Sequence, residues 1–174
     1  MSLIEPEDMP AVEGAAVPQQ VYLVTRQPAP LAGMAFPDWR GLRWEALAGL
    51  GVESVLCLTG DPCPYNPEPL RVLGAIALED LNHGRLPGDP ASEERLLRRA
   101  ADLVLRELRQ GRGVIVHCAG GTGRTGTVIG CVLRGLGHES PEVLAYLDRL
   151  NRRRGKRGWP ESPWQAAMVA GYRE

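Results

Sequence analysis

The fold of this chain is decided by the stretch Val116-His117-Cys118-Ala119-Gly120-Gly121-Thr122-Gly123-Arg124-Thr125-Gly126-Thr127. Three glycines lie within the five positions after the cysteine, between an apolar segment and a segment that favours a helix. Glycine lets successive N–H groups converge on one point, and a helix that begins there adds the positive end of its dipole. The stretch therefore predicts a loop that binds an oxyanion, with a phosphate group as the expected ligand.

Cys118 and Arg124 stand at the two ends of this loop and carry its expected chemistry. Such an environment stabilises a thiolate over a thiol, so Cys118 is the predicted nucleophile. The planar guanidinium of Arg124 can bind two phosphoryl oxygens at once, which a lysine ammonium cannot. The residues expected to surround the phosphate, together with Arg124, are Ala119, Gly120, Gly121, Thr122 and Gly123.

Two nucleotide-binding motifs share letters with this loop. Residues 121–126 satisfy the dinucleotide fingerprint GxGxxG, but that fold needs a second parallel strand ending in an acid about 20 positions later. The sequence instead predicts a further helix beginning at Ser140. A nucleotide P-loop with glycines at 121 and 126 needs a lysine at position 127, where this chain has a threonine. Both nucleotide-binding interpretations are therefore rejected.

The pattern His117-Cys118-x5-Arg124-Thr125-Gly126 resembles the signature of the protein tyrosine and dual-specificity phosphatases, and most of all the small atypical dual-specificity phosphatases. The resemblance runs from about residue 31 to the C-terminal helices and is weak outside the signature. It implies a phosphocysteine intermediate on Cys118, phosphate binding by Arg124, and neither a metal nor another cofactor. In this pattern His117 orients the loop and helps to hold the thiolate, while the Thr125 hydroxyl assists breakdown of the intermediate.

The departure of an alkoxide or phenoxide requires a carboxylic acid that donates a proton and that later activates the attacking water. The resemblance places an aspartate on the loop after the preceding strand, which makes Asp80 the predicted general acid. Asp89 is an alternative, although Asp89 followed by Pro90 also has the form of a helix N-cap and first helical residue. Glu79, His83 or the absence of any acid remain open as well.

Three further features have two interpretations each. Gln165 lies near a glutamine that related phosphatases use to position water, but Ser162 and Gln165 also form a capping box. Cys57 is either a core cysteine or the partner of Cys118 in a protective disulfide, with Cys63 as a weaker alternative partner. A basic cluster either attracts an anionic substrate or forms a solvated helix end, and it consists of Arg149, Arg152, Arg153, Arg154, Lys156 and Arg157.

Apolar patterns predict alternating strands and helices along the rest of the chain. Strands are expected at 21–24, 31–34, 55–58, 73–78 and 114–116. Helices are expected at 42–50, 92–108 and 127–136, and two more after Ser140 and Ser162, each serine acting as an N-cap ahead of a proline. This order predicts a single α/β domain with a central, mostly parallel sheet flanked by helices, and the loop at the carboxyl end of 114–116.

The length of 174 residues fits one compact domain. Residues 1–20 contain several prolines and few large apolar groups, so we expect a loose lead-in before a catalytic domain at 21–174. A net charge of −1 provides no overall attraction to nucleic acid or to an anionic membrane, and no apolar run is long enough to span a bilayer. Four cysteines without a CxxC pair or a secretory signal point to a cytoplasmic protein, which we expect to be a monomer.

The predicted function is hydrolysis of phosphomonoesters on a phosphorylated protein or peptide. The loop residues contain no lysine, whereas phosphoinositide phosphatases of the resembled superfamily carry basic residues there. No long insertion for deep phosphotyrosine recognition is present, which favours a shallow cleft for phosphotyrosine, with phosphoserine and phosphothreonine as further candidates. The alternatives are a phosphate-binding module with little catalysis, and a phosphatase of a small molecule or a phosphoinositide.

Overall fold

A five-stranded sheet forms the centre of the computed structural model, which describes residues 2–60 and 63–174. The strands lie in the order β1-β2-β5-β3-β4. Their bounds are β1 Val21–Thr25, β2 Leu31–Met34, β3 Val52–Cys57, β4 Arg71–Ala75 and β5 Gly113–His117. Strand β1 runs antiparallel to β2, and the other neighbouring pairs are parallel. The predicted α/β class with a mostly parallel sheet is therefore confirmed.

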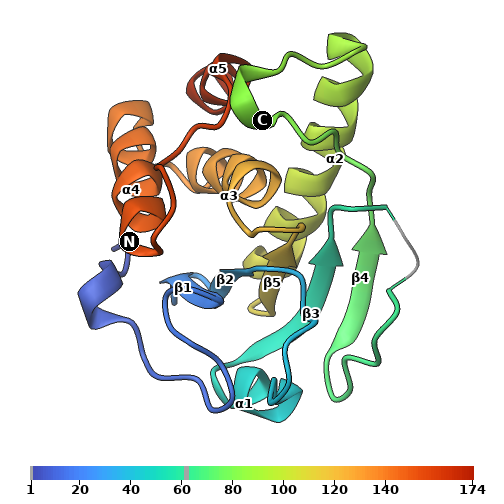
Figure 1. The fold of residues 1–174 in the computed structure, drawn as a ribbon, viewed down its shortest axis with the longest axis vertical. Coiled ribbons are helices and arrows are strands. Elements are labelled where there is room, and N and C mark those ends of the chain that lie inside the picture. The colour runs from blue at the N-terminus through green and yellow to red at the C-terminus, as the bar shows by residue number, and fades with distance from the viewer. Residues whose placement is uncertain (1, 61–62) are drawn as a thin grey trace.

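The described residues also contain five α-helices and two short 3-10 turns. The helices are α1 Trp44–Gly49, α2 Pro90–Arg109, α3 Gly123–Gly135, α4 Ser140–Arg153 and α5 Pro163–Gly171, and the turns are η1 Pro6–Asp8 and η2 Asn82–Gly84. Figure 1 shows α2 to α5 gathered on one side of the sheet and α1 on the other side. Among the described helices, none combines the length and the apolar composition that a membrane span requires.

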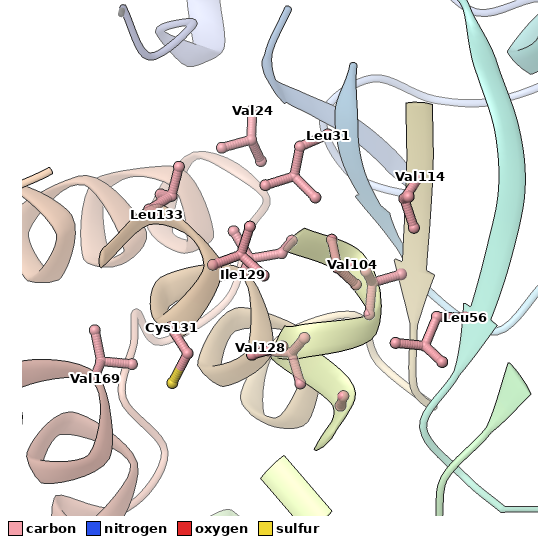
Figure 2. Close-up of a cluster of buried hydrophobic side chains, with 14 of the residues drawn as sticks. Val24, Leu31, Leu56, Val104, Val114, Val128, Ile129, Cys131, Leu133 and Val169 are labelled. Carbon is pink, nitrogen blue, oxygen red and sulfur yellow. The ribbon is translucent and has the colours of Figure 1, made fainter. Parts of the chain in front are cut away.

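Helix α3 lies in the middle of the larger core, between the sheet and the other helices. Figure 2 shows its side chains Val128 and Ile129 among apolar side chains of the sheet, α2 and α5, including Leu31, Leu56, Val104, Val114 and Val169. All of these side chains are fully buried. Burial of one such side chain contributes about 1.5–3 kcal/mol, so the packing holds α3 and the loop before it in a fixed position.

Strand β5 lies in the middle of the sheet, and the loop begins at its carboxyl end. Its residues Val114, Ile115 and Val116 are β-branched and fully buried, which suits a central parallel strand. Strand β5 pairs with both β2 and β3, and its last residue, His117, lies level with Met34 on one side and Cys57 on the other. Cys118 therefore begins the loop at the carboxyl end of the central strand, where ligands bind in parallel α/β sheets.

Some predicted boundaries differ from the structure. Strand β4 ends at Ala75 and not at residue 78, because it lies at the sheet edge and its neighbour β3 ends at Cys57. Helix α3 begins at Gly123 and not at residue 127, since the second half of the loop already forms its first turn. The N-cap of α4 is Glu139 without a side-chain cap bond, so Ser140 is not the cap but part of the helix. The cap predicted at Ser162 is confirmed.

The segment before β1 contacts the rest of the protein. The N–H of Ile4 donates to the carbonyl of Val24 at 2.8 Å, and the Tyr146 hydroxyl of α4 donates to the carbonyl of Ile4 at 2.8 Å. Figure 1 accordingly places the N-terminal end beside α4. The boundary at residue 21 and the loose character of residues 1–20 remain predictions.

Candidate active site

The loop after β5 turns its carbonyl oxygens away from its centre. The carbonyl of Ala119 accepts from the N–H of Phe36 at 2.8 Å, and the carbonyls of Gly120 and Gly121 accept from Arg154 at 3.0 and 2.7 Å. A trans peptide places its C=O and N–H on opposite sides, so the N–H groups of residues 120–122 face the centre of the loop. These N–H groups and the N-terminus of α3 together form a concavity of donors, an arrangement that favours an anion.

Arg154 holds this arrangement from behind the loop. Its side chain is buried, with an exposed fraction of 3% for the residue, and it also donates to the carbonyls of Pro18 and Gln19 and to the Asn151 side chain. The guanidinium lies 4.5 Å from the centre of the Tyr22 ring. The basic cluster was predicted as a substrate-attracting or solvated surface, and for Arg154 this is wrong, because the last turn of α4 directs it into the protein.

Tyr22 of β1 adds a second support for the loop. Its hydroxyl donates to the carbonyl of Gly121 at 2.7 Å. Burial raises the pKa of Tyr22 far above its usual value, outweighing the opposing charge of Arg154, so the hydroxyl stays protonated as a donor. The sequence held no sign of this role, because an apolar strand pattern does not show which side chain reaches a loop 99 positions later.

Gly121 is required by the shape of the loop. Its φ is +68°, a conformation that residues with a Cβ rarely adopt. A Cβ at this position would also lie 2.5 Å from the carbonyl oxygen of Met34. Any other residue at position 121 would collide with β2, so glycine allows the loop to lie this close to the strand.

A pocket of about 200 Å³ lies above the loop. Its lining from the loop consists of Cys118, Ala119, Gly120, Thr122, Gly123 and Arg124, whereas the predicted phosphate-binding residue Gly121 does not line it. Asp80, Asn82 and Glu161 line it from other segments. Cys118 is nearly covered, with an exposed fraction of 3%. The predicted nucleophile, the predicted phosphate-binding arginine and the predicted general acid therefore meet in one pocket.

Asp80 lies close to Arg124 in this pocket. Its Oδ2 is 3.6 Å from Nη2 of Arg124, and its Oδ1 accepts from the N–H of Asn82 at 3.2 Å. The Asp80 side chain is about half exposed, at 49%, whereas that of Arg124 is 13% exposed. Arg124 also donates to the carbonyl of Leu78 at 3.4 Å, which fixes its guanidinium beside the chain that leads to Asp80.

The competing acids have other partners. Asp89 is the N-cap of α2, where its Oδ1 accepts from the N–H of Ser92 at 3.0 Å, as its alternative interpretation predicted. The carboxylate of Glu79 accepts from the N–H of Gly88 at 3.1 Å. His83 lies in the η2 turn with a φ of +56° and lines a neighbouring pocket. None of these three side chains lines the pocket above the loop.

Glu93 of α2 supports the segment that carries Asp80. It is a buried carboxyl whose Oε1 accepts from the N–H of Glu79 at 2.8 Å. Burial raises the pKa of Glu93, and the nearby Glu79 charge acts in the same direction, against the Glu79 N–H and the charge of Arg124. The helix pattern of 92–108 assigns no function to this position, so sequence reasoning missed it.

His117 and Cys57 form a polar group behind Cys118. The His117 Nε2 lies 2.5 Å from the Tyr65 hydroxyl, and its Nδ1 lies 3.2 Å from the carbonyl of Cys118. Burial opposes ionisation of Cys57, but hydrogen bonds with His117 and Thr59 lower its pKa to about 6. All four cysteines are free thiols, so the disulfide considered between Cys57 and Cys118 is not formed in this structure.

Thr125 lies on the first turn of α3, and Gln165 lies on the first turn of α5 with its side-chain nitrogen near the loop. The Thr125 hydroxyl is buried on the first turn of α3 and has no hydrogen-bond partner among the described residues, so it is free to donate. Gln165 forms the predicted capping box with Ser162 through its Oε1. Its Nε2 lies near Gly123, at 3.0 Å from where a Cβ would be. Within residues 2–60 and 63–174, no cluster of three or more His, Cys, Asp or Glu side chains suits a metal ion.

Comparison with known families identifies the domain. The family described as Swiss Army Knife protein, DSP-PTPase phosphatase domain, matches residues 27–158. The chain belongs to this family. This DSP-PTPase domain is therefore an enzyme of the cysteine-dependent protein tyrosine and dual-specificity phosphatases, as the signature around Cys118 implied. No curated protein matches the chain in sequence.

Solved structures share the fold of this DSP-PTPase domain at low sequence identity. A variant of human DUSP28 is 18% identical with a TM-score of 0.59, covering 94% of each chain. A variant of TpbA from P. aeruginosa in complex with pTyr is 21% identical with a TM-score of 0.56, covering 93% of this chain and 90% of that chain. The core catalytic domain of the PP-IP phosphatase SIW14 from S. cerevisiae is 19% identical with a TM-score of 0.57, covering 99% of this chain and 89% of that chain.

Proposed function

We propose that this phosphatase hydrolyses phosphomonoesters on proteins, phosphotyrosine first of all, through a phosphocysteine intermediate on Cys118. The observation that carries the proposal is the pocket in which Cys118, Arg124 and Asp80 meet above a loop whose carbonyls all point outward. Such a pocket offers a nucleophile, an anion-binding surface and a proton donor at one point.

In the first half-reaction the Sγ of Cys118 attacks phosphorus. The new S–P bond forms while the bond from phosphorus to the leaving oxygen breaks, and Asp80 gives its proton to that oxygen. The guanidinium of Arg124 and the inward N–H groups bind the remaining phosphoryl oxygens, whose charge is redistributed in the transition state. The N–H donors already face the centre of the loop in the free protein, because Arg154 and Tyr22 bind the carbonyl groups on the outer side.

In the second half-reaction water attacks the phosphocysteine. An O–P bond forms while the Asp80 carboxylate takes a proton from the water, the S–P bond breaks with its electron pair returning to sulfur, and inorganic phosphate leaves. The resemblance assigns Thr125 to this step, and its unpartnered hydroxyl supports the assignment, since it can donate a hydrogen bond to the departing thiolate.

The charge distribution supports an anionic protein substrate. The loop residues 119–123 contain no lysine, and the cationic side chains of Lys156 and Arg157 line the neighbouring pocket, together with the carboxylates of Asp148 and Glu161. Among the described residues, neither Lys156 nor Arg157 forms an ion pair with a carboxylate. Two similar structures point to different substrates, since a TpbA variant is in complex with pTyr and SIW14 is a PP-IP phosphatase. Both kinds of substrate therefore belong in the test.

The first experiment measures hydrolysis of p-nitrophenyl phosphate. We expect turnover that vanadate inhibits, that EDTA leaves unchanged and that is lost in Cys118→Ser. A wild-type protein that binds phosphate without turnover would show a phosphate-binding module instead. The substrate class is then compared with matched phosphotyrosine, phosphoserine and phosphothreonine peptides and with an inositol pyrophosphate. A preference for the inositol pyrophosphate contradicts the protein-substrate proposal.

The second experiment assigns the general acid. Asp80→Asn should slow hydrolysis of phenyl phosphate, whose leaving group needs a proton, by about 100-fold or more, while p-nitrophenyl phosphate is affected much less. Asp89→Asn serves as the matched control, because Asp89 is a helix cap outside the pocket. The opposite pattern would assign the role to Asp89.

A further inference from the structure

A second pocket, of about 680 Å³, adjoins the pocket above the loop. Asn82, Thr122 and Glu161 line both pockets, so the two share one wall. The second pocket is much larger than the pocket above the loop and contributes no residue to the chemistry proposed for Cys118. A peptide whose phosphoryl group is bound at Cys118 can therefore extend over the shared wall into the second pocket.

The turn between α4 and α5 lines the second pocket and carries two exposed cationic residues, Lys156 and Arg157. The N–H of Lys156 donates to the carbonyl of Asn151 at 2.9 Å, which ties the start of this turn to α4. The N–H of Trp159 donates to Oδ1 of Asp148 at 3.1 Å, which ties its end to the same helix. The backbone that carries the two cations is therefore fixed on both sides of them.

The second pocket keeps a positive charge when its internal ion pair is taken into account. Oδ2 of Asp148 lies 2.9 Å from Nε of Arg152, so these two charges compensate each other. Within residues 2–60 and 63–174, neither Lys156 nor Arg157 forms an ion pair with a carboxylate. Two cations beside the catalytic pocket are therefore available to an anionic part of the substrate.

Glu161 is the carboxyl group on the shared wall, and its surroundings favour its neutral form. Burial raises its pKa, and the negative charge of Asp80 acts in the same direction. The positive charges of Arg124, Lys156 and His83 oppose this, and the influence of Lys156 shows that its charge lies close to the shared wall. Because a raised pKa keeps the carboxyl neutral over a wider pH range, Glu161 repels a bound anion less than an ordinary glutamate would.

We propose that the second pocket binds acidic side chains beside the phosphotyrosine of a protein substrate, with Lys156 and Arg157 as the residues that recognise them. The inference rests on the proposed hydrolysis of phosphoproteins at Cys118. Complementary charges of this kind provide specificity and faster association more than high affinity. Since both cations are exposed, each interaction is weak, and we expect the pair to give a preference of about 10-fold.

Steady-state kinetics with two matched phosphotyrosine peptides test this subsite. One peptide carries glutamate at the two positions on each side of the phosphotyrosine, and the other carries glutamine there. In wild type we expect kcat/KM to be about 10-fold higher for the glutamate peptide, through a lower KM at similar kcat, because the contact is the same in the ground state and the transition state. A rise in salt from about 0.05 to about 0.5 M should remove most of this preference.

Variants then assign the preference to the two cations. In Lys156→Gln/Arg157→Gln the ratio of kcat/KM between the two peptides should fall below about twofold. Because this ratio is measured within one protein, a general change in catalysis or folding cancels. Lys156→Glu/Arg157→Glu should favour a lysine-flanked peptide over the glutamate peptide. Arg95→Gln/Arg99→Gln is the matched control that should keep the wild-type ratio, since both arginines are exposed on α2 and line neither pocket.

Failure of the subsite can be distinguished from failure of the proposed function. Equal kcat/KM for the glutamate and glutamine peptides in wild type excludes the subsite and leaves the protein-phosphatase function intact. A preference that persists in Lys156→Gln/Arg157→Gln places the recognition of acidic residues elsewhere. If hydrolysis of a doubly phosphorylated peptide or an inositol pyrophosphate depends on the two cations and that of the glutamate peptide does not, the pocket binds phosphate instead. If wild type hydrolyses p-nitrophenyl phosphate but neither peptide, the proposed function itself fails.

Discussion

Replacement of Arg154 by alanine tests how the anion-binding loop is held open. The change removes the donor that Gly120 and Gly121 share, together with the bonds to Pro18, Gln19 and the Asn151 side chain. We expect lower stability and lower activity together, because one buried guanidinium fixes both the packing of α4 and the direction of the loop carbonyls.

The loss of stability follows from the acceptors that remain. Gly121 keeps the Tyr22 hydroxyl and Gly120 keeps the Thr122 hydroxyl as a donor. The carbonyls of Pro18 and Gln19 and the Asn151 oxygen lose the donor that Arg154 provides. An acceptor left without a donor costs about 1 kcal/mol at the lower end, which applies here because water can enter the vacated space. Loss of the guanidinium from the Tyr22 ring adds about 1 kcal/mol. The free energy of unfolding should therefore fall by about 4 kcal/mol.

Urea denaturation and steady-state kinetics measure the two effects. The midpoint should shift at a constant m-value, and kcat/KM for p-nitrophenyl phosphate should fall on the order of 100-fold, as for loss of an oxyanion donor. Tyr22→Phe should cost only about 1 kcal/mol, because Gly121 keeps Arg154. Arg152→Ala is the matched control, since its ion pair with Asp148 is solvent-exposed and worth less than about 1 kcal/mol. Equal effects of Arg152→Ala and Arg154→Ala would refute the reasoning.

Three further predictions concern separate sites. Asp89→Ala should destabilise the protein by about 1 kcal/mol, because α2 loses its N-cap, and it should leave kcat unchanged. A fall in kcat in this variant would connect Asp89 to catalysis. Gly121→Ala should lower the free energy of unfolding by about 1–3 kcal/mol and abolish vanadate inhibition. Gly120→Ala is the control, because its added Cβ meets nothing within 4 Å, and it should lower the free energy of unfolding by less than about 1 kcal/mol. Equal losses in the two variants would contradict the structure. Because the pKa of Cys57 is lowered to about 6, its thiolate should stabilise the protein fully above about pH 8.5, and this stabilisation should disappear as the pH falls towards 6. In urea denaturation across this range, the stability of the wild type should therefore rise with pH, and that of Cys57→Ser should lack this rise. The same pH profile in both proteins would exclude a stabilising Cys57 thiolate.

The short-range features of this protein could be predicted from the sequence because their residues are neighbours in the chain. The anion-binding loop between Cys118 and Arg124 depends on consecutive backbone groups, and the caps at Asp89 and Ser162 depend on residues three positions apart. The strand and helix patterns around them were sufficient for the mostly parallel sheet. Boundaries were less accurate, since the end of β4 depends on where its partner β3 ends.

The long-range supports of the loop were not predictable in the same way. Arg154 belongs to a run of basic residues in which sequence cannot show which side chain turns inward, because that depends on how α4 packs against α3. Tyr22 and Glu93 lie in ordinary apolar and helical patterns, and their roles come from contacts with residues far along the chain. Glu161 lies before α5, and only the packing of that segment on Gly123 brings its carboxyl to the pocket.

The sequence by itself determined the anion-binding loop, its thiol and its arginine, and it restricted the general acid to a few carboxyl groups. The tertiary structure decided that Asp80 lines the pocket while Asp89 caps a helix, and it added Arg154, Tyr22 and Glu161 around the loop. The physical reason is that the loop is shaped by local backbone geometry, whereas its supports and carboxyl groups depend on side chains that only the folded core brings together.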